Sequence, residues 1–236
     1  PRDLIAELFK ACALGGARGV LFDFFTLVDK DHFGMEPALA AVLKSAPPAW
    51  LATPFLPQRS ATADARADID ALLQRFALKA DMDGSLDIPE RHASVLLPQP
   101  EIAAAAAGLC DVATPRDVDG VIRGYRLLTR FRGRWYPSMA LAAVLAREKT
   151  REVRVRDGGL TAGRVSVPLE RDGTLRIRFY GPTQALAASA VISGVWDIEE
   201  KGSSKQFDPA KLKDRLVVIG TTAAGLFDLR VTPVVE

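Results

Sequence analysis

Hydrophobic positions in the first part of the chain alternate between helical spacing and short continuous runs. Apolar side chains at positions 4, 5, 8, 9 and 12 share one face and predict an amphipathic helix. The run 19–23 is too short for a helix and is bounded by glycine, which predicts a buried parallel strand. The pair recurs as a helix over 36–45 and a strand at 50–52, so the pattern indicates an α/β arrangement.

The middle of the chain is predicted to run from helix to loop and back to helix. Apolar side chains recur at helical spacing over 64–80, opposite a charged face. Residues 81–100 are rich in Asp, Pro and Gly and predict a loop. The alanine-rich run that begins at Ile102 predicts a further helix, whose small side chains permit close packing.

The apolar period changes to two after residue 152. The alternating segments are 153–155, 165–169 and 175–179. Asp157-Gly158 and Asp172-Gly173 supply turn residues between them. This part of the chain is therefore predicted to form an antiparallel meander.

The last part of the chain returns to the earlier pattern. A helix is predicted over 183–196 and a buried strand over 216–219. No internal repeat and no low-complexity tract interrupts the chain. We therefore expect a single α/β domain over residues 1–236, with a mixed β-sheet, flanking helices and an antiparallel meander in the C-terminal half.

Composition and charge narrow the class of protein. The chain has 236 residues, 48% of them hydrophobic, and a formal net charge of +2. Its basic residues are scattered rather than gathered in a stripe, so nucleic acid is not an expected partner. The longest apolar run, 102–110, is too short for a membrane-spanning helix. Any export signal or membrane anchor is expected to lie outside this sequence.

Several motifs suggest chemistry only weakly. Cys12 and Cys110 could form one disulfide, but two buried apolar thiols are the simpler interpretation. Residues 81–87 offer oxygen ligands for a cation, although their glycine comes too early for an EF-hand loop. His32 and His92 are distant in sequence and give little support to a catalytic triad or a zinc site. No cofactor and no bound metal are expected.

One stretch suggests an enzyme. Leu21–Asp29 resembles the nucleophile loop of haloacid dehalogenase-like hydrolases, with Asp23 at the end of a predicted strand and Thr26 after it. That family usually has a glycine before the threonine, and its later lysine and paired acids have no clear counterpart here. A hydrolase with Asp23 as its nucleophile therefore stays an alternative.

Three stretches, taken in order, resemble the type-two CHASE domain family. They are 97–109, then 115–123 completed by 135–141, and 216–233. The segment from Gly15 to Val20, which leads to Asp23 and Phe25, also fits. Where the family commonly has Gly-Phe-Val-Asn, this chain has Leu109-Cys110-Asp111-Val112, which puts any role of that Asn in doubt.

The resemblance implies a sensory domain of a bacterial transmembrane receptor, held outside the cytoplasm. Membrane helices would flank residues 1–236, and a cyclase, histidine kinase or Ser/Thr kinase would form the cytoplasmic output. The expected partners are a small molecule or a protein signal and a second copy of the receptor. The resemblance transfers no catalytic residue. A dimerisation module that binds no ligand is the remaining alternative.

A ligand site is predicted from strand-end positions. In parallel sheets, ligands commonly bind beyond the carboxyl ends of the strands. The loop 220–225 follows the last predicted strand but lacks the lysine of a phosphate-binding loop. The candidate ligand-binding residues are Asp23, Thr26, Thr221, Thr222, Asp228 and Arg230.

Overall fold

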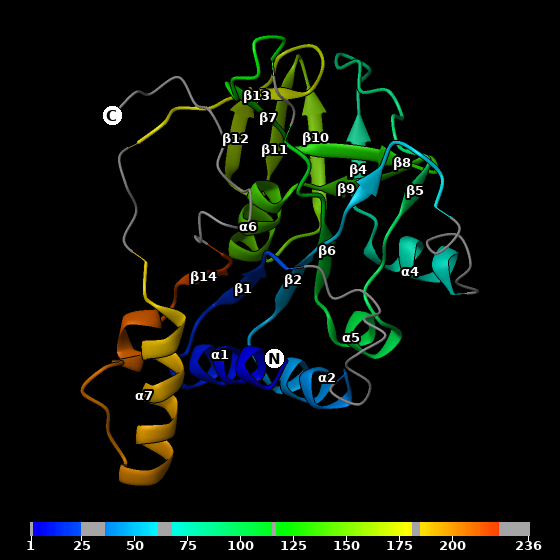
Figure 1. Cartoon of the computed structure of the whole chain (residues 1–236). Coiled ribbons are helices and arrows are strands. Elements are labelled where there is room, and N and C mark those ends of the chain that lie inside the picture. Colours follow the sequence, from blue (N-terminus) through cyan, green and yellow to red (C-terminus); the bar gives the residue numbers. More distant parts are fainter. Residues whose placement is uncertain (1, 25–35, 61–67, 115–116, 181–184, 222–236) are drawn as a thin grey trace. The chain divides into compact units, whose positions relative to one another are not determined.

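The chain folds into two compact units of mixed helices and strands (Figure 1). The computed structural model describes residues 2–24, 36–60, 68–114, 117–180 and 185–221. Unit 1 takes residues 1–51, 98–108 and 181–219, and unit 2 takes residues 52–97, 109–180 and 220–236. The predicted α/β class is confirmed.

Unit 1 is organised by a sheet whose described pairs are parallel. The strands are β1 (Gly19–Phe22), β2 (Ala49–Ala52), β6 (Gly108–Cys110) and β14 (Leu216–Ile219), in the order β14-β1-β2-β6. The helices are α1 (Arg2–Leu14), α2 (Glu36–Ser45), α5 (Pro100–Ala105) and α7 (Ala188–Lys201), with a short 3-10 helix, η1, at Pro209–Leu212. These helices contact one another in the order α7-α1-α2-α5, which follows the order of the strands.

Strand β1 is the centre of this core. It pairs in parallel with β14 on one side and with β2 on the other. All four of its residues are buried, so both faces of the strand are covered, as expected for a parallel strand. The Phe22 ring packs against the Phe9 ring of α1 with centroids 5.3 Å apart. The short apolar run in the sequence is therefore the middle of a two-sided core.

Unit 2 contains the predicted meander. Strands β10 (Glu152–Arg156), β11 (Gly159–Ala162) and β12 (Val165–Pro168) pair antiparallel in sequence order. Strand β4 (Lys79–Met82) joins β10 in parallel, so this sheet is mixed. One face buries Val153, Val155 and Leu160, while the arginines between them face solvent. Helix α6 (Met139–Glu148) packs against β11 (Figure 1).

Smaller elements complete unit 2. They are α4 (Ile69–Phe76) and three antiparallel pairs: β3 (Phe55–Leu56) with β5 (Ser94–Val95), β7 (Gly124–Arg126) with β13 (Thr174–Arg176), and β8 (Leu128–Phe131) with β9 (Arg134–Pro137). The β8–β9 turn has positive φ angles at Arg132 and Gly133. Such angles in a two-residue loop match the twist of the flanking strands.

Three predicted elements differ from the structure. The helix predicted over 64–80 ends at Phe76, because the chain turns extended at Ala77 and enters β4. The last meander strand leaves the meander, since residues 174–176 pair with β7 instead. The helix predicted over 183–196 is α7, Ala188–Lys201, which ends at Gly202 with φ +74°. Glycine tolerates this left-handed angle and so stops helices.

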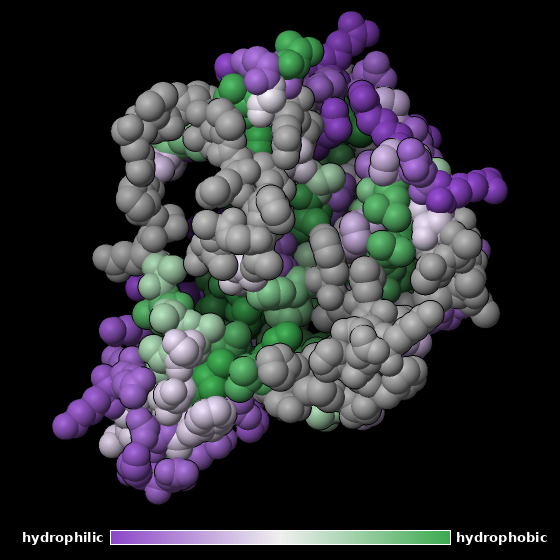
Figure 2. All heavy atoms as spheres, in the orientation of Figure 1, coloured by the Kyte–Doolittle hydropathy of each residue, from purple (hydrophilic) through white to green (hydrophobic). Residues whose placement is uncertain are grey.

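The surface of α7 is polar toward its C-terminal end. Figure 2 shows hydrophilic side chains gathered there, and Lys201 donates to Asp197 at 2.6 Å. One face of α7 is apolar and buries Val191, Ile192 and Val195. This two-sided pattern is the one expected of a helix that packs on a core with one face.

Gly194 of α7 lies where no side chain fits. A Cβ atom at position 194 would clash with Cβ of Phe207, which is itself buried. Helical glycine is normally about 1 kcal/mol less favourable than alanine, so replacement usually stabilises a helix. The close approach of Phe207 reverses this expectation at Gly194.

We predict that Gly194→Ala destabilises the chain by about 1–3 kcal/mol through overpacking. The free energy of unfolding from urea titration measures the effect. Ser193→Ala, on the same helix, is the matched control and should change stability by no more than about 0.5 kcal/mol. Equal or greater stability of Gly194→Ala would show that α7 and Phe207 separate easily.

Candidate functional site

The predicted ligand edge begins where β1 ends. Asp23 follows β1 directly, and its backbone N–H donates to the carbonyl of Ile219, the last residue of β14, at 2.8 Å. The Asp23 side chain is exposed. Thr221 comes two residues after β14 and is partly exposed. The other predicted ligands, Thr26, Thr222, Asp228 and Arg230, lie outside the described residues, so this site stays a prediction.

A buried carboxylate in unit 2 was not among the predicted site residues. Asp111 follows β6 and is 4% exposed. Its side chain accepts hydrogen bonds from the Thr129 hydroxyl and, at 3.0 Å, from the backbone N–H of Ala113. Its backbone N–H donates to the carbonyl of Pro137 at 2.8 Å, and its own carbonyl accepts from Met139 at 3.1 Å. Asp111 therefore ties the end of β6 to the start of α6.

Burial sets the ionisation of Asp111. Removal from water raises the pKa of this carboxyl, because the charged form is the costlier one to bury. The hydrogen bonds from Thr129 and Ala113 act in the opposite direction, and so does the nearby His92. Ser138, next to Asp111 in an isolated β-bridge, is also buried and caps α6 by accepting from the N–H of Leu141 at 3.3 Å.

His92 lies in the same region of unit 2. Its half-buried ring meets the edge of Phe55 at 5.9 Å between centroids. Burial lowers the pKa of His92, with Arg126 and Arg91 adding to the shift and Asp111 opposing it. The Nδ1 atom of the ring is buried and has no hydrogen-bond partner. His92 is therefore neutral at neutral pH, beside a carboxyl whose charge would favour the protonated ring.

The ring of Phe55, which His92 contacts, belongs to an aromatic cluster. Phe55 contacts Phe131 and Tyr136 at 5.5 and 5.2 Å between ring centroids. The Tyr136 hydroxyl donates to the carbonyl of Leu73 at 2.9 Å, and burial raises the pKa of Tyr136 to about 12. Phe55 comes from β3, and Phe131 and Tyr136 come from the distant β8–β9 hairpin, so this cluster holds β3 against that hairpin.

The sequence contained one signal for Asp111. It stands in the otherwise apolar run from Gly108 to Val112, one residue before the position where the resembled family commonly has an asparagine. A lone acid in such a run predicts a buried, hydrogen-bonded group. His92 carried no such signal, because only the pairing of β3 with β5 brings it to the aromatic cluster.

Comparison with known proteins places the chain in a family. The family model for the CHASE2 domain matches residues 1–235, which is nearly the whole chain. This chain belongs to the CHASE2 domain family. CHASE2 domains are extracellular sensory domains of membrane receptors. No curated protein and no solved structure matches the chain.

The helices of this CHASE2 domain were compared with the length and hydropathy of a membrane span. Within the described ranges, none of the helices has the length and apolar character needed to cross a bilayer.

Cys12 and Cys110 are both buried and unbonded to each other, as the simpler interpretation predicted. Burial raises the pKa of Cys12 to about 12, so its thiol is unreactive at neutral pH.

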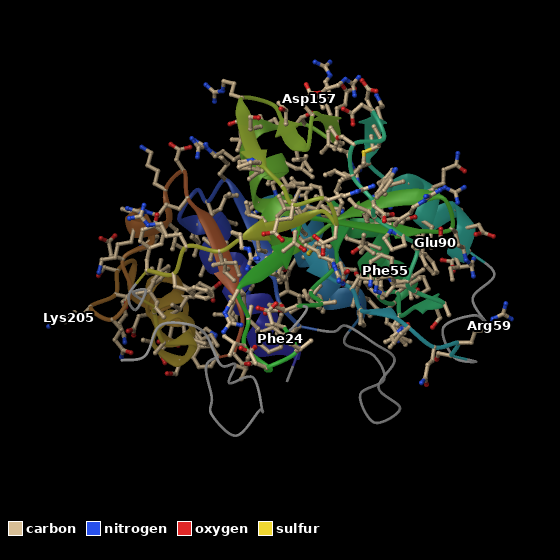
Figure 3. The ribbon with its side chains drawn as sticks, turned by 90° about the horizontal axis from the view of Figure 1, so that it is seen from above. Phe24, Phe55, Arg59, Glu90, Asp157 and Lys205 are labelled. Carbon is tan, nitrogen blue, oxygen red and sulfur yellow. The ribbon has the colours of Figure 1, made fainter. Side chains whose placement is uncertain are left out.

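The possible cation loop of the CHASE2 domain is a structural clamp. Its first two residues end β4, and Asp83 accepts from the N–H and hydroxyl of Ser85 at 2.9 and 2.6 Å and from the N–H of Asp157 at 2.8 Å. Asp157 forms the tip between β10 and β11 (Figure 3). In the part of the chain that the structure describes, no three metal-ligating side chains come together.

We predict that Asp83→Ala lowers the midpoint of thermal unfolding of the CHASE2 domain. The hydrogen bonds from Ser85 lower the pKa of Asp83 to about 2, below its ordinary value of 3.8. Asp83 therefore stabilises the fold above this ordinary value and loses the effect as the pH falls through about 2. Differential scanning calorimetry at several pH values should show the difference from the native chain shrinking in acid. Asp87→Ala, in the same loop, is the control.

We predict that Asp111→Asn changes how stability depends on pH. The folded chain holds the Asp111 proton to a higher pH than the unfolded chain does, because burial raises this pKa above 3.8. The native chain should therefore lose stability relative to Asp111→Asn as the pH rises from about 4 toward neutrality. Urea titrations across this range measure the difference.

Thr129→Val provides the second variant for Asp111. It removes a hydrogen bond to the charged carboxylate and should steepen the loss of stability with rising pH. A constant difference between native chain and Asp111→Asn across the pH range would contradict the burial of a titrating carboxyl.

Proposed function

We propose that this CHASE2 domain is the periplasmic or extracellular input domain of a bacterial transmembrane receptor. It receives a small molecule or a protein signal and controls a cytoplasmic cyclase, histidine kinase or Ser/Thr kinase. The observation that supports the proposal is the family match, which extends over residues 1–235 and so includes both compact units. The domain itself carries out no catalysis in this proposal.

Signalling in this proposal is a population shift. The receptor exchanges between two arrangements, and the signal binds one of them better. A signal that moves the receptor from almost fully off to almost fully on must prefer the active arrangement by about 5.5 kcal/mol. A homodimer doubles the number of binding events that favour that arrangement, because each copy contributes a site.

The ligand edge predicted from the sequence is part of the proposal. Asp23 and Thr221 follow β1 and β14, two strands that pair in parallel register from Gly19 with Leu216 to Phe22 with Ile219. Carboxyl ends of such strands point to one edge of a sheet, where ligands commonly bind. Thr26, Thr222, Asp228 and Arg230 are proposed to belong to the same site.

We predict that the full-length protein carries hydrophobic spans of about 20 residues on both sides of this domain. Protease added to intact spheroplasts should then cleave the domain, whereas a cytoplasmic control protein should survive. The readout is immunoblotting against the domain and the control. Protection of the domain in spheroplasts that remain intact would place it inside the cell and refute the receptor proposal.

A phosphatase assay distinguishes the hydrolase alternative from the sensory proposal, because the hydrolase would depend on the exposed carboxylate of Asp23. If Asp23 were a nucleophile, the isolated chain would release phosphate from small phosphate esters with Mg²⁺, and Asp23→Asn would abolish the release. The sensory proposal expects no turnover from either protein. Glu200→Gln removes a charge from an exposed position of α7 and is the matched control, which shows whether losing one surface carboxylate changes the assay.

A further inference from the structure

His92 leaves a buried polar atom unsatisfied in unit 2. The Nδ1 atom of its ring is buried and has no hydrogen-bond partner. Buried nitrogen and oxygen atoms are almost always hydrogen-bonded, so such an exception calls for an explanation. The ring as a whole is only half-buried, and protons from the solvent can therefore reach its other edge.

Basic groups surround this ring and oppose its protonation. Burial is the largest cause that lowers the pKa of His92, and Arg126 of β7 and Arg91 lower it further. The Nε atom of Arg126 is itself buried without a hydrogen-bond partner. Two more guanidinium groups, those of Arg59 and Arg132, line the same small pocket as the ring. A second proton on His92 would thus place a positive charge among positive charges.

Two carboxylates act in the opposite direction. Asp111 and, to a smaller extent, Glu90 favour the charged ring. Both carboxylates also bind other groups: Asp111 accepts from the Thr129 hydroxyl, and Glu90 accepts from two backbone N–H groups of the β8–β9 turn at 2.7 and 3.1 Å. Burial raises the pKa of Asp111, so its charge, and with it the support for a charged ring, weakens in acid.

The segment that carries His92 is anchored on both sides of the ring. Before the ring, Glu90 holds the β8–β9 turn; after it, the N–H of Ala93 donates to the carbonyl of Leu56 at 2.8 Å. Between these anchors the ring meets the edge of Phe55, which lies near Glu90 in Figure 3. Opening this short stretch would break these contacts and expose Nδ1 to water, where the ring regains its ordinary affinity for protons.

We propose that protons are a signal for this domain, and that protonation of His92 in acid releases residues 90–93 from the β8–β9 hairpin. The closed form favours the neutral ring and the open form favours the charged one, so a falling pH shifts the population toward the open form.

The size of this shift follows from the difference between the two forms. The shift begins as the pH falls below about 6.5, the ordinary pKa of histidine, and each pKa unit between the forms multiplies the open population by up to about ten. The regulatory meaning rests on the proposed receptor function, because an extracytoplasmic domain meets the pH of its surroundings. The protonation step itself does not depend on that function.

Proton NMR of the histidine ring in the 236-residue chain tests the first step. His32 is the only other histidine, so His32→Gln leaves the signal of His92 alone. We expect this signal to titrate with a midpoint below about 6.5. On this background, Arg126→Gln should raise the midpoint by removing a positive neighbour. Arg154→Gln, on the exposed face of β10, is the matched control and should leave it unchanged.

Hydrogen exchange tests the release of the segment. The reporters are the backbone N–H groups of Ala93, Arg132 and Gly133, whose bonds hold the closed form. Between about pH 7.5 and about pH 5.5, and after correction for the intrinsic effect of pH, these groups should lose protection at least about threefold in the native chain. His92→Gln should not show this loss. The N–H of Asp23, in unit 1, should stay equally protected in both proteins.

Three outcomes would overturn the proposal. They are a histidine midpoint at or above about 6.5, equal changes in protection in the native chain and His92→Gln, and a loss of protection that extends equally to Asp23. If His92→Gln does not fold, Arg126→Gln takes its place in the exchange experiment and should reduce the loss. None of these results bears on the spheroplast experiment, so a failed proton switch and a failed receptor proposal are distinguishable.

Discussion

The fold of unit 1 depends on the parallel pairing of β1 with β14. Gly19 to Phe22 lie in register with Leu216 to Ile219, so an early and a late segment of the sequence pair at one side of the sheet. Parallel sheets occur almost only where helices cover their faces. In unit 1 the helices α1, α2, α5 and α7 contact one another in series. This pairing also brings Asp23 next to the end of β14. Because this pairing joins segments far apart in the sequence, forming it closes a long loop, which costs conformational entropy.

Unit 2 illustrates a different constraint, the cost of burying polar groups. Asp111 is accommodated because Thr129, Ala113 and the surrounding backbone supply donors. His92 is accommodated less completely, since its buried Nδ1 has no partner. Unsatisfied buried groups are uncommon in folded proteins and call for an explanation.

The sequence predicted several elements of unit 1 because their signals are local. The run at 19–23, the helix at 36–45 and the run at 216–219 are each recognisable within one segment, and the structure has β1 at Gly19–Phe22, α2 at Glu36–Ser45 and β14 at Leu216–Ile219. Strand β11 was missed, because Gly159 begins it and Leu160 is its one large apolar residue. The partner of β13 was also wrong, since strand pairing depends on distant residues rather than on local period.

The contrast between local signals and contacts of distant segments also applies to the candidate site residues. Asp23 could be placed at a strand end from the sequence, because a buried run followed by a polar residue is a local pattern. His92 and Phe55 could not be brought together from the sequence, because the antiparallel pairing of β3 with β5 creates their proximity. The clamp at Asp83 was read as a possible cation loop, since its true partner, the N–H of Asp157, lies in another hairpin.

The register between β1 and β14 has a mechanical consequence. Because the strands run in the same direction, tension between the chain before β1 and the chain after β14 acts along the strands and loads their hydrogen bonds in shear. Bonds loaded in this way share the force and break together, whereas bonds at a peeled edge break one by one. Unit 1 is therefore built to carry a pull between its two ends as a stiff link.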